Sequence, residues 1–226
     1  QTDGKILLGG TFDTYNLNDA RGLVRLNTNG AQDATFNPIG ISAGNPAVND
    51  LLVLPDGKIL VGGTGLDIAN QNLLRLNPNG SGDTSWPNGN GNGGVLEILR
   101  QTDGKIIAVG GFTSYLGQSR NRIVRLNADG TLDGTFTPGT GANNQIFAAE
   151  FQPDGKILIG GAFTTYNGTT RNRIARLNTD GTLDTTFAPV SGANSTVTSI
   201  VVLSDGKFVI GGNFTTYDGT ARIRLA

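Results

Sequence analysis

Short hydrophobic runs separated by Gly, Asn and Asp recur along the whole chain of 226 residues. The clearest set of four runs lies at Gln145–Phe151, Lys156–Ala162, Arg173–Asn178 and Leu183–Ala188. Each run is rich in β-branched, aliphatic or aromatic residues, and runs of this length between turn residues predict β-strands. No stretch of ten or more residues has the apolar spacing of an amphipathic helix. We therefore expect an all-β chain and name the four strands a, b, c and d.

The pattern repeats at intervals of about 50 residues. The segment Asp-Gly-Lys-(Ile/Phe) occurs five times, beginning at Asp3, Asp56, Asp103, Asp154 and Asp205. An apolar-Arg-Leu segment follows in each copy, with Arg25, Arg75, Arg125, Arg176 and Arg224. Four antiparallel strands at this period are typical of a propeller blade, whereas solenoid coils usually have a shorter period. The sequence predicts a single β-propeller domain or segment with four-stranded antiparallel blades, and repeats at about 1–46, 47–94, 95–144, 145–195 and 196–226.

Two motifs resemble a known family. They are Q-x-D-G-K-I-L-x-G-G-x-F at Gln152–Phe163 and R-L-N-x-D-G-x-L-D-x-x-F at Arg176–Phe187. Together they resemble the delta-60 repeat family of bacterial β-propeller proteins, and the resemblance covers essentially the whole chain. It implies a propeller within large secreted or surface-associated bacterial proteins and transfers no catalytic residues. The second repeat departs from the pattern, with Thr64-Gly65-Leu66 in place of the Phe-to-Tyr segment and Trp86 in place of Phe.

The strand pattern is incomplete in the first and last repeats. The first repeat begins at its a–b turn, and the last one stops within strand c, at Leu225-Ala226. Unpaired strand edges template association with other chains, so a stable ring needs complete terminal blades. We expect a segment of a longer propeller-bearing polypeptide, and a five-bladed ring closed by imperfect pairing is the alternative.

Charge and composition exclude several functions. The 17 basic and 18 acidic residues nearly balance, with no basic run, which argues against a nucleic-acid partner. Cys and His are absent, so thiol or imidazole catalysis and the corresponding zinc sites are excluded. No apolar stretch approaches the ~20 residues that span a bilayer, so we expect no direct membrane insertion. The polar, weakly charged composition is typical of secreted bacterial repeat proteins and favours an extracellular or cell-surface location.

The b–c and d–a connections vary in length, whereas the a–b and c–d turns are short and uniform. Successive turns of a blade alternate between its two rims, so the variable connections share one face. Because variable loops on a fixed scaffold usually carry binding, this face is the candidate surface for a protein or glycan partner. The candidate residues are Tyr15, Tyr115, Tyr166 and Tyr217 as stacking platforms for sugar rings, with Arg120, Asn121, Arg171 and Asn172 as hydrogen-bond donors. The alternative is that the tyrosines pack against neighbouring blades.

The Asn-x-Asp-Gly-x-x-Asp turns suggest a calcium hypothesis, because oxygen side chains at alternate positions can converge on a hard cation. The best set is Asn178, Asp180 and Asp184, followed by Asn127, Asp129 and Asp133. Asx turns explain the same residues without a metal, so we expect no cofactor and keep calcium as the alternative.

The recurring Lys, Arg and Asp predict a polar framework within each blade, because an Arg in an apolar strand is costly to bury unpaired. Most acids belong to repeated turns. Glu97 and Glu150 do not; they lie on a strands, which line a propeller's axis, and are the catalytic candidates if the chain is an enzyme. We expect a non-catalytic structural or adhesive module. The alternative is a carbohydrate-active enzyme, a glycosidase or lyase, with acids in the central channel.

Overall fold

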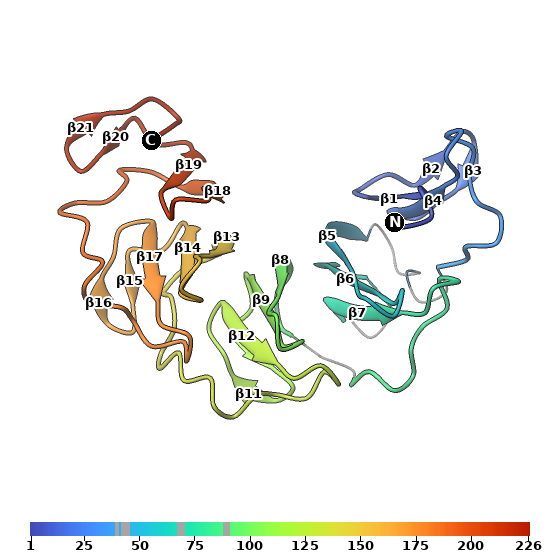
Figure 1. Ribbon diagram of the computed structural model, residues 1–226, viewed down its shortest axis with the longest axis horizontal. Helices are drawn as coiled ribbons and strands as arrows, with labels where there is room; N and C mark the ends of the chain where they lie inside the picture. The colour runs from blue at the N-terminus through green and yellow to red at the C-terminus, as the bar shows by residue number, and fades with distance from the viewer. Residues whose placement is uncertain (39–40, 42–45, 67–70, 88–90) are drawn as a thin grey trace.

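The computed structural model describes residues 1–38, 41, 46–66, 71–87 and 91–226, and all the regular structure in these ranges is β. Five blades follow one another in chain order around an open arc, with the two terminal blades at its ends (Figure 1). In the described part of the chain, no helix is long and apolar enough to cross a membrane. The all-β propeller expectation is confirmed.

Blades 2, 3 and 4 are three-stranded antiparallel sheets with strand b in the middle. Each strand a carries a β-bulge near its start, for example between Val95 and Glu97. In the order a, b, c, the strands are β5 (Ala47–Val53), β6 (Ile59–Thr64) and β7 (Leu73–Leu76); β8 (Val95–Arg100), β9 (Ile106–Gly110) and β12 (Ile123–Leu126); and β13 (Ile146–Phe151), β14 (Ile157–Gly161) and β17 (Ile174–Leu177).

The terminal blades have fewer strands. Blade 1 contains β1 (Ile6–Gly9) and β4 (Leu23–Leu26), which are its strands b and c. Blade 5 contains β18 (Val197–Val202) and β19 (Phe208–Gly212), which are its strands a and b. A single bridge between Gly211 and Leu225 marks the start of its strand c.

The b–c connections contain a short hairpin that the sequence pattern did not predict. Its strands are β2 (Thr14–Tyr15) and β3 (Asn18–Asp19), β10 (Ser114–Tyr115) and β11 (Gln118–Ser119), β15 (Thr165–Tyr166) and β16 (Thr169–Thr170), and β20 (Thr216–Tyr217) and β21 (Thr220–Ala221). Both tip residues have positive φ, for example 45° at Asn167 and 74° at Gly168. This is the type I′ geometry that matches the twist of two paired strands. The hairpins lie on the outside of the arc (Figure 1).

The expected strand d is reduced to one bridge. In repeat 4, Leu183 pairs with Leu177 of strand c, and regular pairing stops there. Asp184 Oδ1 then accepts hydrogen bonds from the N–H and hydroxyl of Thr186 (2.9 and 2.7 Å), which curls the backbone into an Asx turn. An extended strand over Leu183–Ala188 is therefore not formed.

The segment after this turn crosses to the next blade. In repeat 3, Thr137 N–H donates to Asp180 O of blade 4 at 2.7 Å, and Ala142 bridges to Tyr166 of the same blade. The outer edge of blade 4 is thus covered by residues 137–142 of the preceding repeat. This crossover ties each repeat to the following blade and explains why one repeat does not form a self-contained four-stranded sheet.

The hydrophobic core lies between successive blades. One cluster joins Leu158 and Ile174 of blade 4 to Val197 and Ile210 of blade 5. Close approach requires glycine in strand b, because a Cβ on Gly160 would lie 2.6 Å from Val197 Cγ1. Burial of these side chains is the main source of stability, so each blade depends on its neighbours.

Candidate functional site

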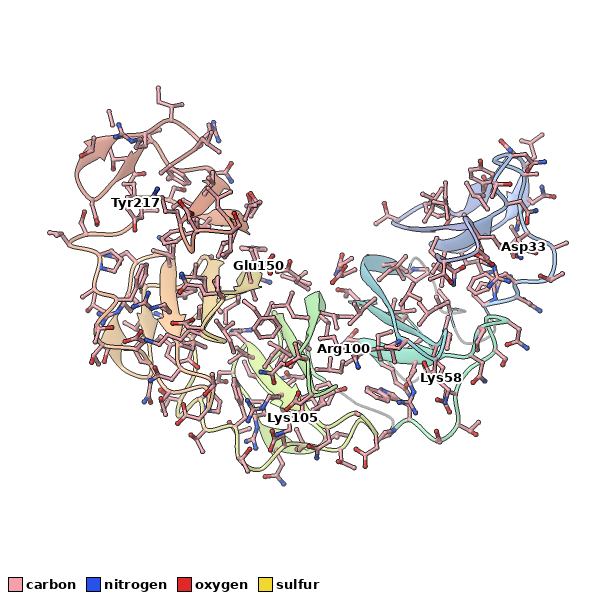
Figure 2. The ribbon with its side chains drawn as sticks, in the orientation of Figure 1. Asp33, Lys58, Arg100, Lys105, Glu150 and Tyr217 are labelled. Atoms are coloured by element: carbon pink, nitrogen blue, oxygen red, sulfur yellow. The ribbon has the colours of Figure 1, made fainter. Side chains whose placement is uncertain are left out.

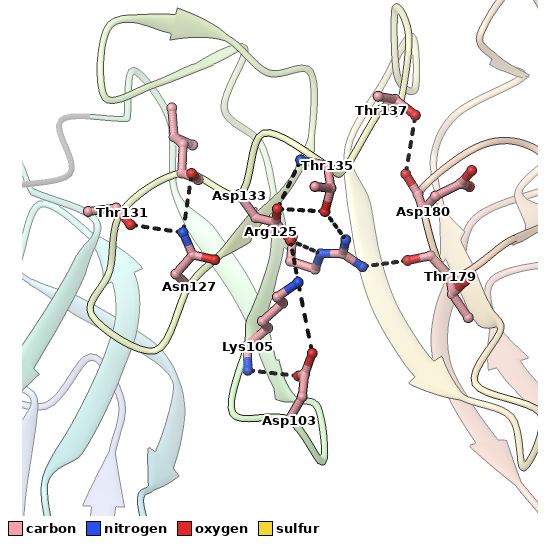
Figure 3. A network of polar contacts seen from close by, with 11 residues as sticks. Asp103, Lys105, Arg125, Asn127, Thr131, Asp133, Thr135, Thr137, Thr179 and Asp180 are labelled. Atoms are coloured by element: carbon pink, nitrogen blue, oxygen red, sulfur yellow. Dashed lines mark hydrogen bonds and ion pairs between the residues drawn. The ribbon is translucent and has the colours of Figure 1, made fainter.

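A polar framework fixes the turn face of each blade. In blade 3, Asp133 Oδ2 accepts a hydrogen bond from Arg125 Nε at 2.7 Å and forms an ion pair with Lys105 Nζ at 3.0 Å (Figure 3). The Arg125 guanidinium lies over the Phe136 ring, 4.8 Å from its centroid, and donates to Thr179 O in blade 4. Burial opposes ionisation of Asp133, yet hydrogen bonds led by those of Thr135 outweigh it and hold its pKa well below the usual range. The predicted framework is confirmed.

The same arrangement recurs in the other repeats. Arg25 and Arg75 also pair with an Asp of their own turn and donate to a carbonyl of the next blade, at Pro78 and Ala128. Arg176 pairs with Asp184, but its two terminal nitrogens donate within its own repeat, to Gln152 Oε1 and Thr186 Oγ1. Arg25, Arg75 and Arg125 therefore each form an interblade hydrogen bond, called here the interblade clasp, as well as an intrablade ion pair.

Arg224 does not belong to this set. The sequence prediction that it is the equivalent of Arg176 in the last repeat is therefore wrong. Its φ of 69° and its N–H bond to Phe214 O match Arg173, whose φ is 67° and whose N–H donates to Phe163 O. Arg224 therefore lies just before strand c rather than within it. Ile223-Arg224-Leu225 imitates the apolar-Arg-Leu segment because the residue at the position of Asn172 happens to be apolar.

The calcium candidates are engaged in turn geometry. Asp180 Oδ1 accepts the N–H and hydroxyl of Thr182 (3.0 and 2.7 Å), which lowers its pKa, and Asn178 Nδ2 donates to the same hydroxyl. Asp184 already pairs with Lys156 and Arg176. The equivalent residues Asn127, Asp129 and Asp133 make the same contacts. Within the described residues, no group of three or more acidic side chains could hold a metal ion.

The four tyrosines lie on the outer hairpins. Tyr115 and Tyr166 are buried, with 1% and 0% of their surface exposed, and burial raises the pKa of both. Tyr166 Oη donates to Gly181 O at 2.9 Å, and half-buried Tyr15 makes the equivalent bond to Gly30 O. Burial raises the pKa of the half-buried Tyr217 to about 12. The packing alternative describes Tyr115 and Tyr166, which present no open ring face for a sugar.

The neighbouring donor candidates lie on the same face and stabilise its loops. Asn121 Nδ2 donates to Thr140 O at 2.7 Å, and Asn172 Nδ2 donates to Ser191 O at 2.9 Å. Arg120 and Arg171 each donate one hydrogen bond from a terminal nitrogen to the carbonyl of the residue before them. The structure thus brings the hairpins and the d–a connections together, as the alternation of turns predicts.

Sequence reasoning missed an Asn that joins these two loops. Asn143 Oδ1 accepts the N–H groups of Thr164 and Thr165 at 2.9 and 3.1 Å, and its Nδ2 donates to Thr164 Oγ1 at 2.9 Å. Asn92 and Asn194 make the same three bonds in their blades. The repeated Gly-Ala-Asn at 141–143 and 192–194 was the available signal.

A second candidate region lies on the inner rim, where a cavity of about 200 Å³ is lined by the a strands of blades 2 to 5. Asp50 Oδ2 accepts the N–H of Ile98 at 2.7 Å, and Glu97 Oε2 accepts the N–H of Ala149. Burial, together with the charges of Asp50 and Glu150, raises the pKa of Glu97 to about 7, and the Ala149 N–H opposes this shift.

Burial also raises the pKa of Asp50, although the N–H groups of Ile98 and Leu51 oppose the shift. Glu150 lies on the inner side of the arc, where it accepts the N–H of Phe151 at 3.1 Å (Figure 2). The structure therefore adds Asp50 to the acids singled out from the sequence.

Comparison with known proteins agrees with this architecture. The fold and its repeated framework define a β-propeller, and the family described as "Domain of unknown function (DUF5122) beta-propeller" matches residues 1–36, 54–85, 101–136, 152–187 and 203–226. The chain therefore belongs to the DUF5122 β-propeller family, in agreement with the resemblance to delta-60 repeats. No curated protein matches the chain.

Solved structures show the same fold. The WD40 β-propeller domain of Doa1 matches with a TM-score of 0.59 and 17% identity, over 92% of this chain and 57% of that one. The extracellular domain of the putative one component system BT4673 from B. thetaiotaomicron matches with a TM-score of 0.56 and 13% identity. That match covers 93% of this chain and 25% of the other. The chain thus spans only part of the length of each structure.

Proposed function

We propose that the chain is a non-catalytic binding module of a secreted or cell-surface bacterial protein, and that it contacts protein or glycan through its outer hairpins. The observation that carries this proposal is a contrast between two kinds of position. The framework residues of the turns recur in every complete repeat, whereas the exposed second strands of the hairpins differ. Those strands read Asn18-Asp19, Gln118-Ser119, Thr169-Thr170 and Thr220-Ala221.

The chemistry of these strands suits recognition of a polar partner. All eight residues are exposed, and most carry an amide, hydroxyl or carboxylate. Those of repeats 3, 4 and 5 stand on hairpins held by the Asn143-type bonds, so little conformational entropy is lost when a partner binds. The extracellular setting of the BT4673 domain and the polar, weakly charged composition support a location outside the cell.

The test is binding to a printed array of polysaccharides and purified extracellular proteins. A hairpin variant, Gln118→Lys with Thr169→Lys and Thr220→Lys, is compared with a turn-face control, Thr102→Lys with Ser204→Lys. All five positions are exposed, so both proteins should fold. The proposal expects binding that the hairpin variant loses and the control keeps. Absence of binding, or equal loss in both variants, contradicts it.

The inner rim favours a second candidate function, a carbohydrate-active enzyme such as a glycosidase or lyase. A carboxylic acid with a pKa near 7 beside other carboxylates has the protonation behaviour that a general acid requires. If the chain is such an enzyme, a screen of polysaccharide substrates should detect turnover. The Glu97→Gln variant should then lower the turnover rate by about 100-fold or more. Activity that survives this substitution would exclude Glu97 as the acid.

A further inference from the structure

Two residues at the boundary between blades 2 and 3 depart from the repeat. The first is Trp86, whose ring lies beneath Arg75 of its own repeat. The equivalent rings in the other repeats are those of Phe36, Phe136 and Phe187. The second is Arg100, the last residue of strand a in blade 3. Strand a of blades 4 and 5 ends instead with Phe151 and Val202. The shared framework does not require either departure.

Arg100 leaves space that an apolar residue fills at the next boundary. Between blades 3 and 4, Phe151 packs against the core cluster that contains Phe136. Arg100 is exposed instead, and it lies where blades 2 and 3 face each other (Figure 2). A cavity of about 220 Å³ is present at this boundary. Its apolar lining consists of Leu54, Pro55, Trp86 and Ile106.

The cavity also has a cation that is free to bind a ligand. Arg75 and Arg100 both line it. The guanidinium of Arg75 is already engaged, since its nitrogens donate to Asp83, Ser85 and the Ala128 carbonyl. Arg100 makes no hydrogen bond or ion pair with any residue that the structure describes. A guanidinium beside an apolar wall is suited to a carboxylate that carries an apolar body.

Two further features narrow the class of ligand. Asp56 also lines the cavity, and its carboxylate would repel a multiply charged anion. Trp86 Nε1 is a buried donor with no acceptor among the described residues, although buried polar atoms nearly always have a partner. The volume lies below the about 300–1,000 Å³ of sites for drug-sized ligands. The cavity therefore suits a compact anion with a single charge.

We propose that this cavity, called here the Trp86 cavity, binds a small free carboxylic acid with an aromatic or aliphatic body. The carboxylate pairs with Arg100 through charge-assisted hydrogen bonds. The apolar body packs against Trp86, Leu54 and Ile106, which removes its surface from water. Pro55 and Asp56 belong to an a–b turn, so the cavity opens on the turn face. It is a second site, separate from the hairpin surface proposed for a protein or glycan.

The test is a titration of the whole chain with phenylacetate, followed by the fluorescence of Trp86, the single Trp. Two matched probes separate the contributions of charge and ring. Phenylacetamide has the same size without the charge, and acetate has the charge without the ring. We expect saturable binding of phenylacetate with a Kd of about 1 mM or below, and binding of each matched probe that is weaker by about tenfold or more.

Chain variants locate the site. Arg100→Val introduces the residue that ends strand a in blades 2 and 5, so the variant should fold, and it should weaken phenylacetate binding about tenfold. Arg120→Gln removes one positive charge from the outer hairpins and should leave binding unchanged. Trp86→Phe restores the ring of the other repeats and should weaken binding about threefold or more, measured by saturation-transfer NMR of the ligand. Far-UV circular dichroism confirms the fold of each variant.

The possible outcomes separate the parts of the proposal. Absence of saturable binding, or equal affinity for phenylacetamide, overturns the carboxylate ligand. Equal weakening in Arg100→Val and Arg120→Gln overturns the location. Acetyl-Gly-Gly-Phe presents the same groups at the end of a peptide. Weaker binding of this peptide than of phenylacetate supports a free acid, whereas tighter binding overturns it in favour of a protein C-terminus.

Discussion

Removal of the Arg125 side chain tests the interblade hydrogen bond. The matched residue is Arg176, which makes no bond to the next blade. Arg125 and Arg176 occupy equivalent positions, pair with an Asp at 2.7 and 2.8 Å, and lie over an aromatic ring at 4.8 and 5.1 Å. Of these two, only Arg125 reaches the next blade, at Thr179 O. Arg125 is also more deeply buried, with 7% of its side chain exposed against 21% for Arg176.

These differences give the expected magnitudes. Breaking a buried ion pair costs about 3–5 kcal/mol. Lys105 remains beside Asp133 in the Arg125→Ala variant, which places this part of the loss at the lower end. The interblade hydrogen bond from a charged donor adds about 1.5 kcal/mol. We therefore expect a loss of about 4 kcal/mol in the free energy of unfolding for Arg125→Ala and about 2 kcal/mol for the more exposed Arg176→Ala.

The assay is equilibrium unfolding in urea, followed by far-UV circular dichroism and by the fluorescence of Trp86, the single Trp. Two probes are needed because repeat arrays can unfold in parts. Arg120→Ala is the control, since the Arg120 side chain donates to the adjacent Ser119 carbonyl and the substitution keeps the backbone bond to Thr113 O. It should change stability by less than about 0.5 kcal/mol. A loss below about 1 kcal/mol for Arg125→Ala, or an equal loss for Arg176→Ala, refutes the clasp.

Three further predictions follow from the hairpins and the inner rim. Leu17 lies at the tip of the first hairpin, where it is 98% exposed and has a strained φ of 67°. Replacing it with Gly should relieve this strain and stabilise the chain by about 1 kcal/mol, which a rise in Tm would show. An unchanged Tm would contradict the strain. Asn143→Ala should cost about 1–2 kcal/mol in urea unfolding because two N–H groups lose their acceptor, and a cost near zero would show that water replaces it. The pKa of Glu97 is raised from 4.5 to about 7, so its contribution to stability is fully present below pH 4.5 and is lost as pH rises through 7. Relative to Glu97→Gln, the Tm of the unaltered chain should therefore fall between pH 5 and 8, and parallel profiles would contradict the shift.

Strands a, b and c could be predicted from the sequence because each is bounded by its own turn residues. The framework could also be predicted, since charges that recur in register within apolar strands need partners. Both features depend on contacts within one repeat. Asp154 and Gly155 illustrate this local coding, because Asp154 Oδ1 caps the N–H of Lys156 and Gly155 takes the positive φ of the a–b turn.

Strand d could not be predicted because its place depends on the neighbouring blade. The outer hairpins had a local signal that the strand pattern missed, since Asn167-Gly168 suits a type I′ turn. Residues 137–142 look like a loop in their own repeat and become an outer edge only beside Asp180 and Tyr166 of the next one. The contacts of the acids on the inner rim could not be predicted for the same reason. The periodicity of strand a does not reveal that its bulge brings Asp50 to Ile98 of the following blade.

The central claim is that partners bind at the outer hairpins rather than at the turn face or the inner rim. Hydrogen-exchange mass spectrometry with a partner identified on the array tests it most directly. We predict slower amide exchange on binding at residues 112–121 and 163–172, with little change at the a–b turns and at β8 and β13. Protection confined to β8, β13 or the turns would contradict the claim and transfer the function to the inner rim or to the turn face.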